Sequence, residues 1–433
     1  MTAAAIDPTT LGHDRPHVSP DDIATGVVIG RTSEFFDFFV YAIASVLVFP
    51  KVFFPYLSPL DGTLASFAVF SLAFVARPFG SIAFMWLDRE HGRGVKLTVA
   101  LFMLGGATAG IAFLPGYADI GRQAIWLLAL LRLAQGFALC GAWDGLASLL
   151  ALNAPENRRG WYAMIPQLGA PLGLIVASLM FAYFTSTLSA DDFIDWGWRF
   201  PFFVALAINV VALFARLRIV VTAEFETLFA SRDLQPARVR ETWASQWKPI
   251  LIGAFAPLAS FAMFHMVTVF PLSWVNLYAA GTSTRFLLIE TLSATIGTGA
   301  IIASGVMADR VGRRTTLGVS AVLIAVFSGF AVVLLGHDFG GELAYMVIGF
   351  VVLGLAFGQS SGAVASNFPT RYRYTASAMT SDLAWLVGAG FAPFIALWLS
   401  ANYGLMTGGT YLLSGAVATL AALWYNRELG MAR

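Results

Sequence analysis

Long apolar segments recur along the whole chain and are separated by short stretches rich in glycine, proline and charged residues. A helix that crosses a membrane needs roughly 20 consecutive, mostly apolar residues, and about twelve segments reach that length. Their approximate limits are 22–50, 63–87, 95–115, 122–150, 160–185, 199–220, 249–277, 284–307, 315–336, 342–366, 375–400 and 404–425. The pattern therefore predicts an all-α membrane protein with about twelve transmembrane helices.

The longest polar connection lies between the sixth and seventh segments and divides the chain into two halves. The resulting units are a tail at 1–21, a half at 22–220, a linker at 221–248, a half at 249–425 and a tail at 426–433. Short charged loops recur in both halves, since Asp88-Arg89 follows the second segment and Asp309-Arg310 follows the eighth. The repetition predicts two pseudo-symmetric six-helix halves, which transporters rock against each other around a central site.

Lysine and arginine are distributed unequally between the two sides of the predicted bundle. Most of the 26 basic residues lie on the side that also holds both chain ends, and the positive-inside rule places that side in the cytoplasm. Of all residues 58% are hydrophobic and 12% charged, against about 25% charged in an ordinary soluble domain. We therefore expect a multi-pass protein of the plasma (inner) membrane, and the net charge of +1 predicts no nucleic-acid partner.

The first apolar segment is unusual because it contains three charged residues, Arg31, Glu34 and Asp37. A charge near the bilayer centre costs at least about 2.5–3.5 kcal/mol. At about 100° per residue, these three side chains share one stripe of the helix with Gly30 and Tyr41. The stripe is therefore expected to face a protein interior or a water-filled path, where Tyr41 can contact a substrate.

Two roles are open for the carboxylates of this stripe. A proton-coupled carrier needs a carboxyl group that loads and releases a proton as access switches, and burial and a nearby arginine act on such a group in opposite directions. We favour Asp37 as the proton site, with Glu34 as its partner or as the partner of Arg31. A static buried ion pair that orients the first helix is the alternative.

Two arginines and a glutamine lie within other apolar segments. Arg132, about ten residues into the fourth segment, can hold a substrate carboxylate, hold Asp37, or cap backbone carbonyls. Gln135 lies close to the same helix face and can add a hydrogen-bond donor. Arg77 precedes Pro78, which frees a backbone carbonyl one turn earlier, and is expected to support the inner gate.

Three further titratable residues in apolar segments have open roles. Asp144 either pairs with Arg158 or Arg159 near the cytoplasmic mouth or takes part in proton transfer. Asp382 either contacts the substrate or a proton, or forms a hydrogen bond between helices. His265 either senses pH or donates a hydrogen bond to the substrate, or it is a hydrogen-bonded packing residue.

Short motifs occur in a fixed order over most of the chain. They are Gly30-x-x-x-Glu34-Phe-Phe-Asp37-Phe-x-x-Tyr41, Phe53-Phe54-Pro55, Ala76-Arg77-Pro78-Phe79-Gly80, Arg132-Leu-Ala-Gln135-Gly136-Phe137, Arg158-Arg159-Gly160, Gln167-x-Gly169, Trp196-Gly197-Trp198-Arg199-Phe200-Pro201-Phe202, Asp309-Arg310-Val-Gly312-Arg313-Arg314 and Pro369-Thr-Arg371. In order and spacing they resemble the major facilitator superfamily and, more narrowly, its metabolite–proton symporter family. The resemblance implies a major facilitator fold and proton-coupled import of small carboxylates or zwitterions.

The resemblance also implies roles for individual residues, among them a substrate contact for Gln167. A latch that holds the cytoplasmic side closed is expected from Asp88, Arg93, Asp309, Arg310, Arg313 and Arg314. The family usually has Gly-Gly-Glu in the fourth segment, where this chain has Cys140-Gly141-Ala142. The role of that glutamate is therefore not carried over to Ala142, and Asp382 stands where the resemblance suggests an asparagine.

The sequence contains none of the patterns that other function classes require. No glycine-rich loop with Lys-Ser/Thr is present, so energy is expected to come from an ion gradient and not from a nucleotide. No metal-ligand spacing and no nucleophile–base pair is found, so we expect no metal, no cofactor and no enzyme activity. The predicted function is that of a monomer that imports a small organic acid or zwitterion with a proton. A proton-antiporting exporter, a facilitative uniporter and a non-transporting membrane sensor are the alternatives.

Overall fold

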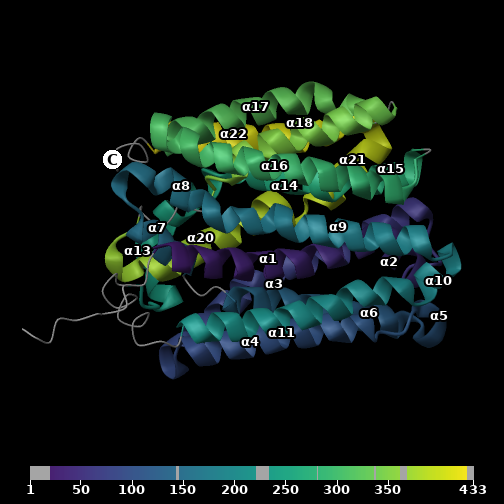
Figure 1. The fold of residues 1–433 in the computed structure, drawn as a ribbon, viewed down its shortest axis with the longest axis horizontal. Coiled ribbons are helices and arrows are strands. Elements are labelled where there is room, and N and C mark those ends of the chain that lie inside the picture. The colour runs from purple at the N-terminus through teal and green to yellow at the C-terminus, as the bar shows by residue number, and fades with distance from the viewer. Residues whose placement is uncertain are drawn as a thin grey trace, which may run out of the picture.

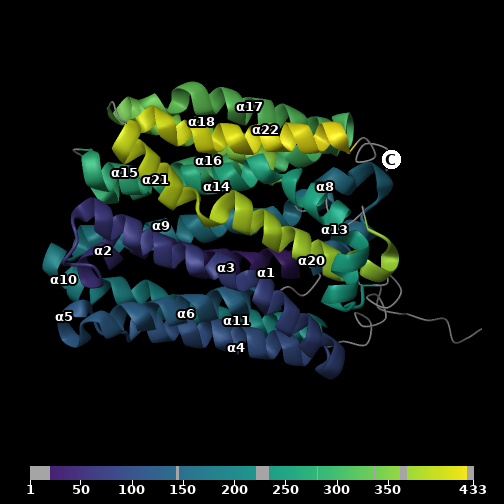
Figure 2. The same cartoon turned by 180° about the vertical axis from the view of Figure 1, so that it is seen from behind.

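The computed structural model describes residues 20–142, 146–220, 234–279, 281–335, 338–360 and 368–426. These residues form a bundle of long, roughly aligned helices (Figures 1 and 2), and no β-strand occurs among them. Ten helical segments of the described chain are long and apolar enough to cross a membrane. The other two predicted spans correspond to α1 (Pro20–Leu47), which carries the buried charges, and α17 (Arg313–Leu334). The predicted all-α membrane fold is confirmed.

The N-terminal half comprises the helices up to residue 220 and lies in the lower part of Figure 1, in purple to teal. In chain order it contains α1, α2 (Phe49–Val52), α3 (Pro59–His91), α4 (Arg93–Ala112), α5 (Tyr117–Ile120), α6 (Arg122–Gly141), α7 (Leu146–Asn153), η2 (Glu156–Arg158), α8 (Arg159–Met164), η3 (Ile165–Leu168), α9 (Gly169–Thr187), α10 (Ala190–Asp195), η4 (Gly197–Arg199) and α11 (Phe200–Val220).

Most of the C-terminal half, in green to yellow, lies above most of the N-terminal half in Figure 1. It contains α13 (Val239–Phe255), α14 (Leu258–Thr268), α15 (Phe270–Tyr278), α16 (Ser283–Val311), α17, α18 (Phe339–Phe357), η5 (Thr370–Tyr372), α20 (Arg373–Ala384), η6 (Trp385–Gly390), α21 (Ala392–Tyr403), η7 (Leu405–Gly408) and α22 (Gly409–Tyr425). Helix α13 begins inside the predicted linker 221–248, of which residues 221–233 lie outside the described residues.

Several transmembrane segments consist of more than one helix, and proline explains two of the breaks. Because proline has no N–H and its ring clashes with the preceding turn, it interrupts the hydrogen bonds of a helix. Pro166 lies in the 3₁₀ turn η3, which separates α8 from α9. Pro393 follows the π-helical turn η6 in the middle of the eleventh span. Trp385 of this turn reaches the N-terminal half, where its ring stacks on Phe74.

Glycines bring the helices that carry the charged residues into backbone contact. A Cβ atom at Gly136 of α6 would lie 2.1 Å from the carbonyl oxygen of Ala73 on α3. One at Gly80 of α3 would lie 2.3 Å from the carbonyl oxygen of Phe137 on α6. Larger residues would force the two helices apart, as expected for small residues at a membrane helix interface. This close approach fixes the charged side chains of α3 and α6 relative to one another.

The two halves meet along the centre of the bundle as well as at its ends. In Leu258–Tyr278, which spans α14 and α15, 94% of the most apolar stretch is buried inside the protein. Helix α9 of the N-terminal half packs along α16 of the C-terminal half, and α3 packs against α20 and η6. Aromatic rings from both halves fill the centre. The charged stripe of α1 is therefore enclosed by protein, as its spacing predicts.

The helix order gives the bundle two distinct ends. Helix α1 begins and α22 ends at the same end, near α8 and α13, as an even number of spans requires (Figure 1). We call this the predicted cytoplasmic end. The opposite end, near α10 and the end of α15, is the predicted outer end. The names follow the distribution of lysine and arginine along the sequence.

Candidate functional site

The charged stripe of α1 leads into a chain of hydrogen bonds that connects three helices. Thr108 of α4 donates from Oγ1 to Oδ1 of Asp37 over 2.8 Å. Gln135 of α6 donates from Nε2 to the Thr108 hydroxyl, 2.9 Å, and accepts at Oε1 from Nη1 of Arg132, 3.1 Å. All four residues are buried, with at most 3% of their surface exposed. Asp37 and Arg132 are thus connected through two neutral side chains and not by a direct ion pair.

The Arg132 guanidinium is held by aromatic rings as well as by hydrogen bonds. Its Cζ lies 3.8 Å from the ring centroid of Tyr41 and 4.8 Å from that of Phe70, and Nε donates to the Phe70 carbonyl, 3.2 Å. The remaining nitrogen, Nη2, is buried and has no hydrogen-bond partner in the described part of the chain. A buried donor without a partner is costly, and arginine binds carboxylates well. The geometry therefore leaves one donor free for an anionic ligand.

Two more polar side chains in this region lack partners. The Tyr41 hydroxyl and both ring nitrogens of His265 are buried, and none of them has a hydrogen-bond partner among the described residues. The His265 ring centroid lies 5.5 Å from that of Phe38 and 5.3 Å from that of Phe70. His265 therefore packs against aromatic rings of the other half without the hydrogen bond that a packing role predicts. Its nitrogens are polar groups buried among aromatic rings without a hydrogen-bond partner in the described part of the chain.

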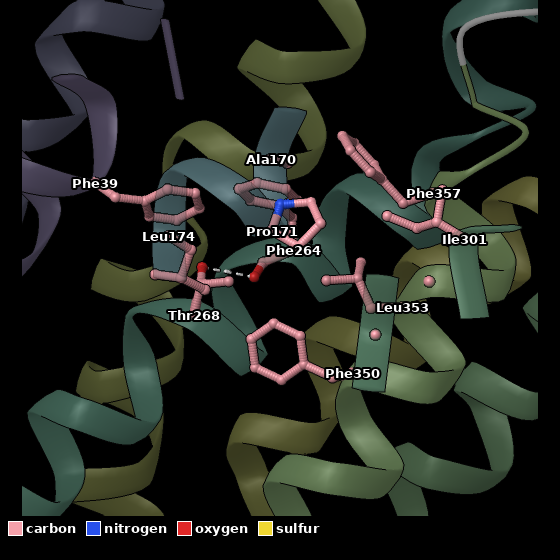
Figure 3. Close-up of a pocket in the computed structure, with 12 residues that line it drawn as sticks. Phe39, Ala170, Pro171, Leu174, Phe264, Thr268, Ile301, Phe350, Leu353 and Phe357 are labelled. Carbon is pink, nitrogen blue, oxygen red and sulfur yellow. Dashed lines mark hydrogen bonds between the residues drawn. The ribbon is translucent and has the colours of Figure 1, made fainter. Parts of the chain in front are cut away.

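A small cavity lies between the halves on the side of α9 and α16 (Figure 3). It is lined by Phe39, Ala170, Pro171, Leu174, Phe264, Thr268, Gly297, Ile301, Phe350, Leu353, Gly354 and Phe357. The lining is almost entirely apolar, and the Thr268 hydroxyl is already bonded to the Phe264 carbonyl, 2.8 Å. Phe264 also contacts the His265 ring, 5.3 Å between centroids. Phe264 thus borders both the cavity and His265.

Glu34 is bound by two arginines. Arg31 donates from Nη1 to Oε2, 2.8 Å, and Arg216 of α11 donates from Nη1 to Oε1, 2.7 Å. Arg216 is 4% exposed and also donates from Nη2 to the carbonyl of Ala142, 3.2 Å. A Cβ atom at Gly30 would lie 2.6 Å from Nε of Arg216, so this glycine makes room for the second arginine. The pairing of Glu34 with Arg31 matches the sequence prediction, whereas the charge distribution places Arg216 only among the loop charges.

A second buried ion pair joins the two halves. Arg77 of α3 donates from Nε to Oδ1 of Asp382 on α20, 3.1 Å, and Ser81 donates to Oδ2. Cys140, the only cysteine of the chain, lies beside this pair. Its Sγ donates to the Arg77 carbonyl, 2.9 Å, and is 3.7 Å from Oδ1 of Asp382. Of the roles open to Asp382, the structure shows a contact between helices, made with the arginine expected at the inner gate.

Replacing Asp382 with Asn is expected to open the bundle near Cys140. The change removes the charge that faces Arg77, and breaking one side of a buried ion pair typically costs about 3–5 kcal/mol. Because the Arg77 side chain is 16% exposed, water offsets part of this loss. We expect at least about a tenfold rise in the rate of maleimide labelling of Cys140, which corresponds to about 1.4 kcal/mol. With one cysteine in the chain, the labelling rate reports opening at this place alone.

Glu342→Gln is the matched control for this measurement. Glu342 accepts from Arg285 over 2.8 Å in an ion pair that lies within the C-terminal half. Its loss should leave the labelling rate of Cys140 unchanged. Equal labelling of Asp382→Asn and the wild type would contradict a gating role for the pair between the halves.

Polar contacts between the halves continue toward the predicted cytoplasmic end. Lys96 of α4 is fully buried and donates from Nζ to Oδ2 of Asp88, 2.8 Å, and to the hydroxyl of Tyr374 on α20, 2.7 Å. Tyr374 donates to the same Asp88 oxygen, 3.1 Å. The Arg93 Cζ lies 5.2 Å from the Tyr374 ring centroid, and Nη2 donates to the carbonyl of Leu234, 2.9 Å. Asp88 and Arg93 of the predicted latch thus meet the C-terminal half at Tyr374.

The second segment of the predicted latch reaches the N-terminal half through Asp309 at the end of α16. Its carboxylate accepts from the backbone N–H groups of Gly160, 2.6 Å, and Trp161, 3.1 Å. Arg313 donates from Nη2 to the carbonyl of Arg159, 3.4 Å. The start of α8 is therefore held by an acid and a base of the other half.

Two other residues of the predicted latch have different surroundings. Arg314 donates from Nη2 to the carbonyl of Leu423, 2.6 Å, and from Nη1 to that of Asn426, 3.3 Å, at the end of α22. Cations stabilise the C-terminal end of a helix, so Arg314 fastens α22 within its own half. Arg310 is exposed and has no hydrogen bond or ion pair among the described residues. A gating role for these two arginines stays a prediction.

Gln167 lies in the seam between the halves and donates from Nε2 to the hydroxyl of Ser360, 3.3 Å. Its Oε1 is buried without a partner in the described part of the chain. Asp144 lies outside the described residues. Within the ranges that the structure describes, no group of three or more His, Cys, Asp or Glu side chains could hold a metal ion.

Comparison with known proteins agrees with this arrangement of helices. The sequence profile described as Major Facilitator Superfamily matches residues 32–393. The chain belongs to the major facilitator superfamily. The two-halved major facilitator fold predicted from the sequence motifs is confirmed, and the protein is a multi-pass membrane transporter.

Relatives in this superfamily cover nearly the whole chain. The inner membrane metabolite transport protein YhjE of Escherichia coli (strain K12) is 36% identical over 431 residues, which is 97% of this chain and 98% of the relative. The shikimate transporter of the same organism is 30% identical over 419 residues, 92% of this chain and 93% of the relative. The proline/betaine transporter of that organism is 27% identical over 409 residues, 92% of this chain and 81% of the relative.

Among solved structures, the proton:xylose symporter XylE superimposes with a TM-score of 0.69, covering 94% of each chain. The sequences are only 16% identical, so this similarity supports the fold alone. The matching family and these relatives are membrane transporters and not enzymes.

Proposed function

We propose that the protein imports a small organic acid or zwitterion together with a proton by alternating access. The observation that carries this proposal is the Arg132 guanidinium, which has a free buried donor and is joined through Gln135 and Thr108 to the carboxyl group of Asp37. An anion site and a proton site are thus held in one hydrogen-bonded chain. Symport requires that the occupancy of two such sites be linked.

The substrate side of the proposed mechanism centres on Arg132. A substrate carboxylate can accept from the free Nη2 and, by displacing Gln135, also from Nη1, which gives the two-pronged geometry that guanidinium groups favour. The Tyr41 and Phe70 rings keep the guanidinium in place. His265 offers a further donor or acceptor from the opposite half. Relatives named as shikimate and proline/betaine transporters, whose named substrates carry carboxylate groups, support this class of substrate.

The proton side centres on Asp37. Its carboxylate accepts from the neutral hydroxyl of Thr108, whereas Glu34, three residues earlier on the same helix, is held by two arginines. A buried carboxylate without a cation is disfavoured, and one with two cations is stabilised. We therefore assign the exchangeable proton to Asp37 and a structural ion pair to Glu34. A substrate that draws Gln135 away from Arg132 also disturbs Thr108, which connects substrate binding to the proton site.

The gate of the proposed cycle is formed by the contacts between the halves at the predicted cytoplasmic end. They comprise the Arg77–Asp382 pair, the Asp88–Lys96–Tyr374 cluster and Asp309 at the start of α8. Such contacts favour the state that is closed at this end, and release of the substrate toward the cytoplasm requires that they separate.

One chain encloses the complete site between its halves, so we propose that the protein functions as a monomer. We propose that it lies in the plasma (inner) membrane with both termini in the cytoplasm.

Proton flux in proteoliposomes tests the proposed function. Purified protein is reconstituted, and external pH is followed after addition of a panel of small carboxylates, aromatic acids and betaines. We expect external alkalinisation for one class of compound, because a proton enters with each substrate molecule. External acidification would show proton antiport, as expected of an exporter. A labelled compound that equilibrates without any pH change would show uniport.

A further inference from the structure

One buried acid has no part in the mechanism proposed above. Glu290 of α16 is 0% exposed, and Ser178 of α9 donates to its Oε2 over 3.0 Å, across the seam between the halves. Its other oxygen, Oε1, is buried without a hydrogen-bond partner in the described part of the chain. The hydroxyl of Ser293, one turn further along α16, is also buried and unpartnered there. The carboxyl group is therefore enclosed with a single neutral donor.

No cation stands opposite Glu290 in the described residues. The other titratable residues of the helices packed around α16 are Tyr183 on α9, Glu342 and Tyr345 on α18, Tyr278 on α15, Glu156 and Arg158 on η2, Arg159 and Tyr162 on α8, and Arg313 and Arg314 on α17. On α16 itself, Arg285 is paired with Glu342, and Asp309 and Arg310 lie at the far end. None of these groups forms an ion pair or hydrogen bond with Glu290.

A comparison with Glu342 shows how the absence of a cation affects the charge of Glu290. Both glutamates are buried in the C-terminal half, with 0% and 4% of their surface exposed, but only Glu342 has an arginine, 2.8 Å away. Burying an unpaired carboxylate is so unfavourable that the group takes up a proton instead. Glu290 is therefore a neutral carboxylic acid as long as the seam around it stays closed.

The position of Glu290 in the seam determines when it meets water. Toward the predicted outer end, the hydroxyls of Thr185 on α9 and Thr284 on α16 lie 2.8 Å apart. Glu290 and Ser178 come next in the direction of the bundle centre. The apolar cavity begins beyond them, about one turn from Ser178 on α9, at Leu174, and about two turns from Glu290 on α16, at Gly297. Because α9 and α16 belong to different halves, opening of the outer end separates this seam and admits water to Glu290.

We propose that Glu290 is a proton-binding site, separate from Asp37, that lets the predicted outer end close only while it holds a proton. In the open state the acid is hydrated and can lose its proton to the outer solution. Closing the seam over an ionised Glu290 would bury an unpaired charge, so closure waits for reprotonation. Acidic outer solution therefore favours the closed outer end. The Glu290 proton is exchanged only with the outer solution, so it does not add to the number of protons transported with each substrate molecule.

Distance measurements across the outer end test the proposal. Spin labels are attached at Ser186→Cys on α9 and Gly340→Cys at the start of α18, two exposed positions in different halves, in a chain with Cys140→Ala. Double electron–electron resonance is recorded on purified protein in lipid nanodiscs over a series of pH values. We expect the longer distance to lose population as the pH falls. Glu290→Gln, a neutral variant of the same shape, should lose this pH dependence and keep the short distance throughout.

Two further variants separate the proposal from a loss of folding. Glu342→Gln removes a buried glutamate of the same half that already has an arginine, and it should keep the pH dependence of the wild type. Ser178→Ala keeps the Glu290 carboxyl group but removes its donor, and it should keep a pH dependence with a shifted midpoint. Wild-type distances that do not change with pH, or a Glu290→Gln response equal to that of the wild type, would overturn the proposal.

Transport measurements distinguish this inference from the proposed function. Glu290→Gln should carry the same number of protons per substrate molecule as the wild type, because its proton does not cross the membrane. A change in that number would overturn the gating role and make Glu290 part of the coupling pathway. If Asp37→Asn left accumulation intact, the proposed function would fail, whereas the pH dependence assigned to Glu290 would stand.

Discussion

Replacing Asp37 with Asn is expected to abolish accumulation of substrate against a gradient while sparing exchange. Asparagine has nearly the shape of aspartate and can still accept from the Thr108 hydroxyl, which lies 2.8 Å from Oδ1 in the wild type. It cannot load or release a proton, so the energy of the proton gradient no longer reaches the substrate. The measurement compares uptake of a labelled substrate under an inward proton gradient with counterflow exchange in the same proteoliposomes. The accumulation ratio should fall to about one, because binding without coupling only equilibrates the substrate.

Glu34→Gln provides the comparison on the same helix. Glu34 is held by Arg31 and Arg216, so its loss leaves two arginines without their shared partner and is expected to lower the yield of folded protein. The molecules that do fold should still accumulate substrate. Wild-type accumulation in Asp37→Asn, or full loss of coupling in Glu34→Gln alone, would contradict the assignment of the proton site to Asp37 and favour Glu34.

Parts of the site could be predicted because they depend on spacing within one helix. Arg31, Glu34 and Asp37 share one face of α1, and an apolar helix with charges on one face must turn that face toward protein. The buried positions of Asp37 and Glu34 confirm this expectation. The same argument placed Gln135 beside Arg132, since the two lie three residues apart and are hydrogen-bonded. A pattern of period 3.6 is readable without knowledge of other helices.

Other parts depend on contacts between helices that are distant in sequence. Arg216 is four residues from the end of α11, where a basic residue is typical of a cytoplasmic boundary, yet it turns inward to Glu34, 182 residues away. Lys96 lies four residues after the loop that precedes α4, and it too is fully buried. The positive-inside rule describes how charges are distributed among loops. It cannot show which of them find a carboxylate once the helices pack.

The same limit applies to the acids of the C-terminal half. Asp382 meets Arg77 across 305 residues, and no local pattern connects them. Glu290 lies in an apolar run that begins after Arg285, and the sequence pattern predicts no role for it. In the structure that arginine pairs with Glu342, 57 residues away, which leaves Glu290 without a cation in the described chain. The identity of a partner is a tertiary property, and it decides whether a buried acid is charged.

Replacing Arg132 with Lys is expected to weaken substrate binding strongly while leaving the coupling ratio unchanged. Lysine keeps the positive charge but cannot present two parallel N–H groups to a carboxylate, and it loses the stacking on the Tyr41 ring, 3.8 Å from the guanidinium carbon. A hydrogen bond to a charged group contributes about 1.5–3 kcal/mol. Losing one of two such bonds should therefore raise the KM for uptake by about 10- to 100-fold. The measurement is the concentration dependence of uptake, together with the number of protons taken up per substrate molecule.

Arg122→Lys is the matched control, since Arg122 lies on the same helix but is exposed at its start. It should leave both the KM and the coupling ratio unchanged. The two readouts separate the roles that the sequence leaves open for Arg132. If the arginine binds the substrate carboxylate, the KM rises and each substrate molecule still brings its proton. If it acts instead on Asp37 through Gln135 and Thr108, the proton ratio falls while the KM changes little, and an unchanged KM would contradict carboxylate binding at this position.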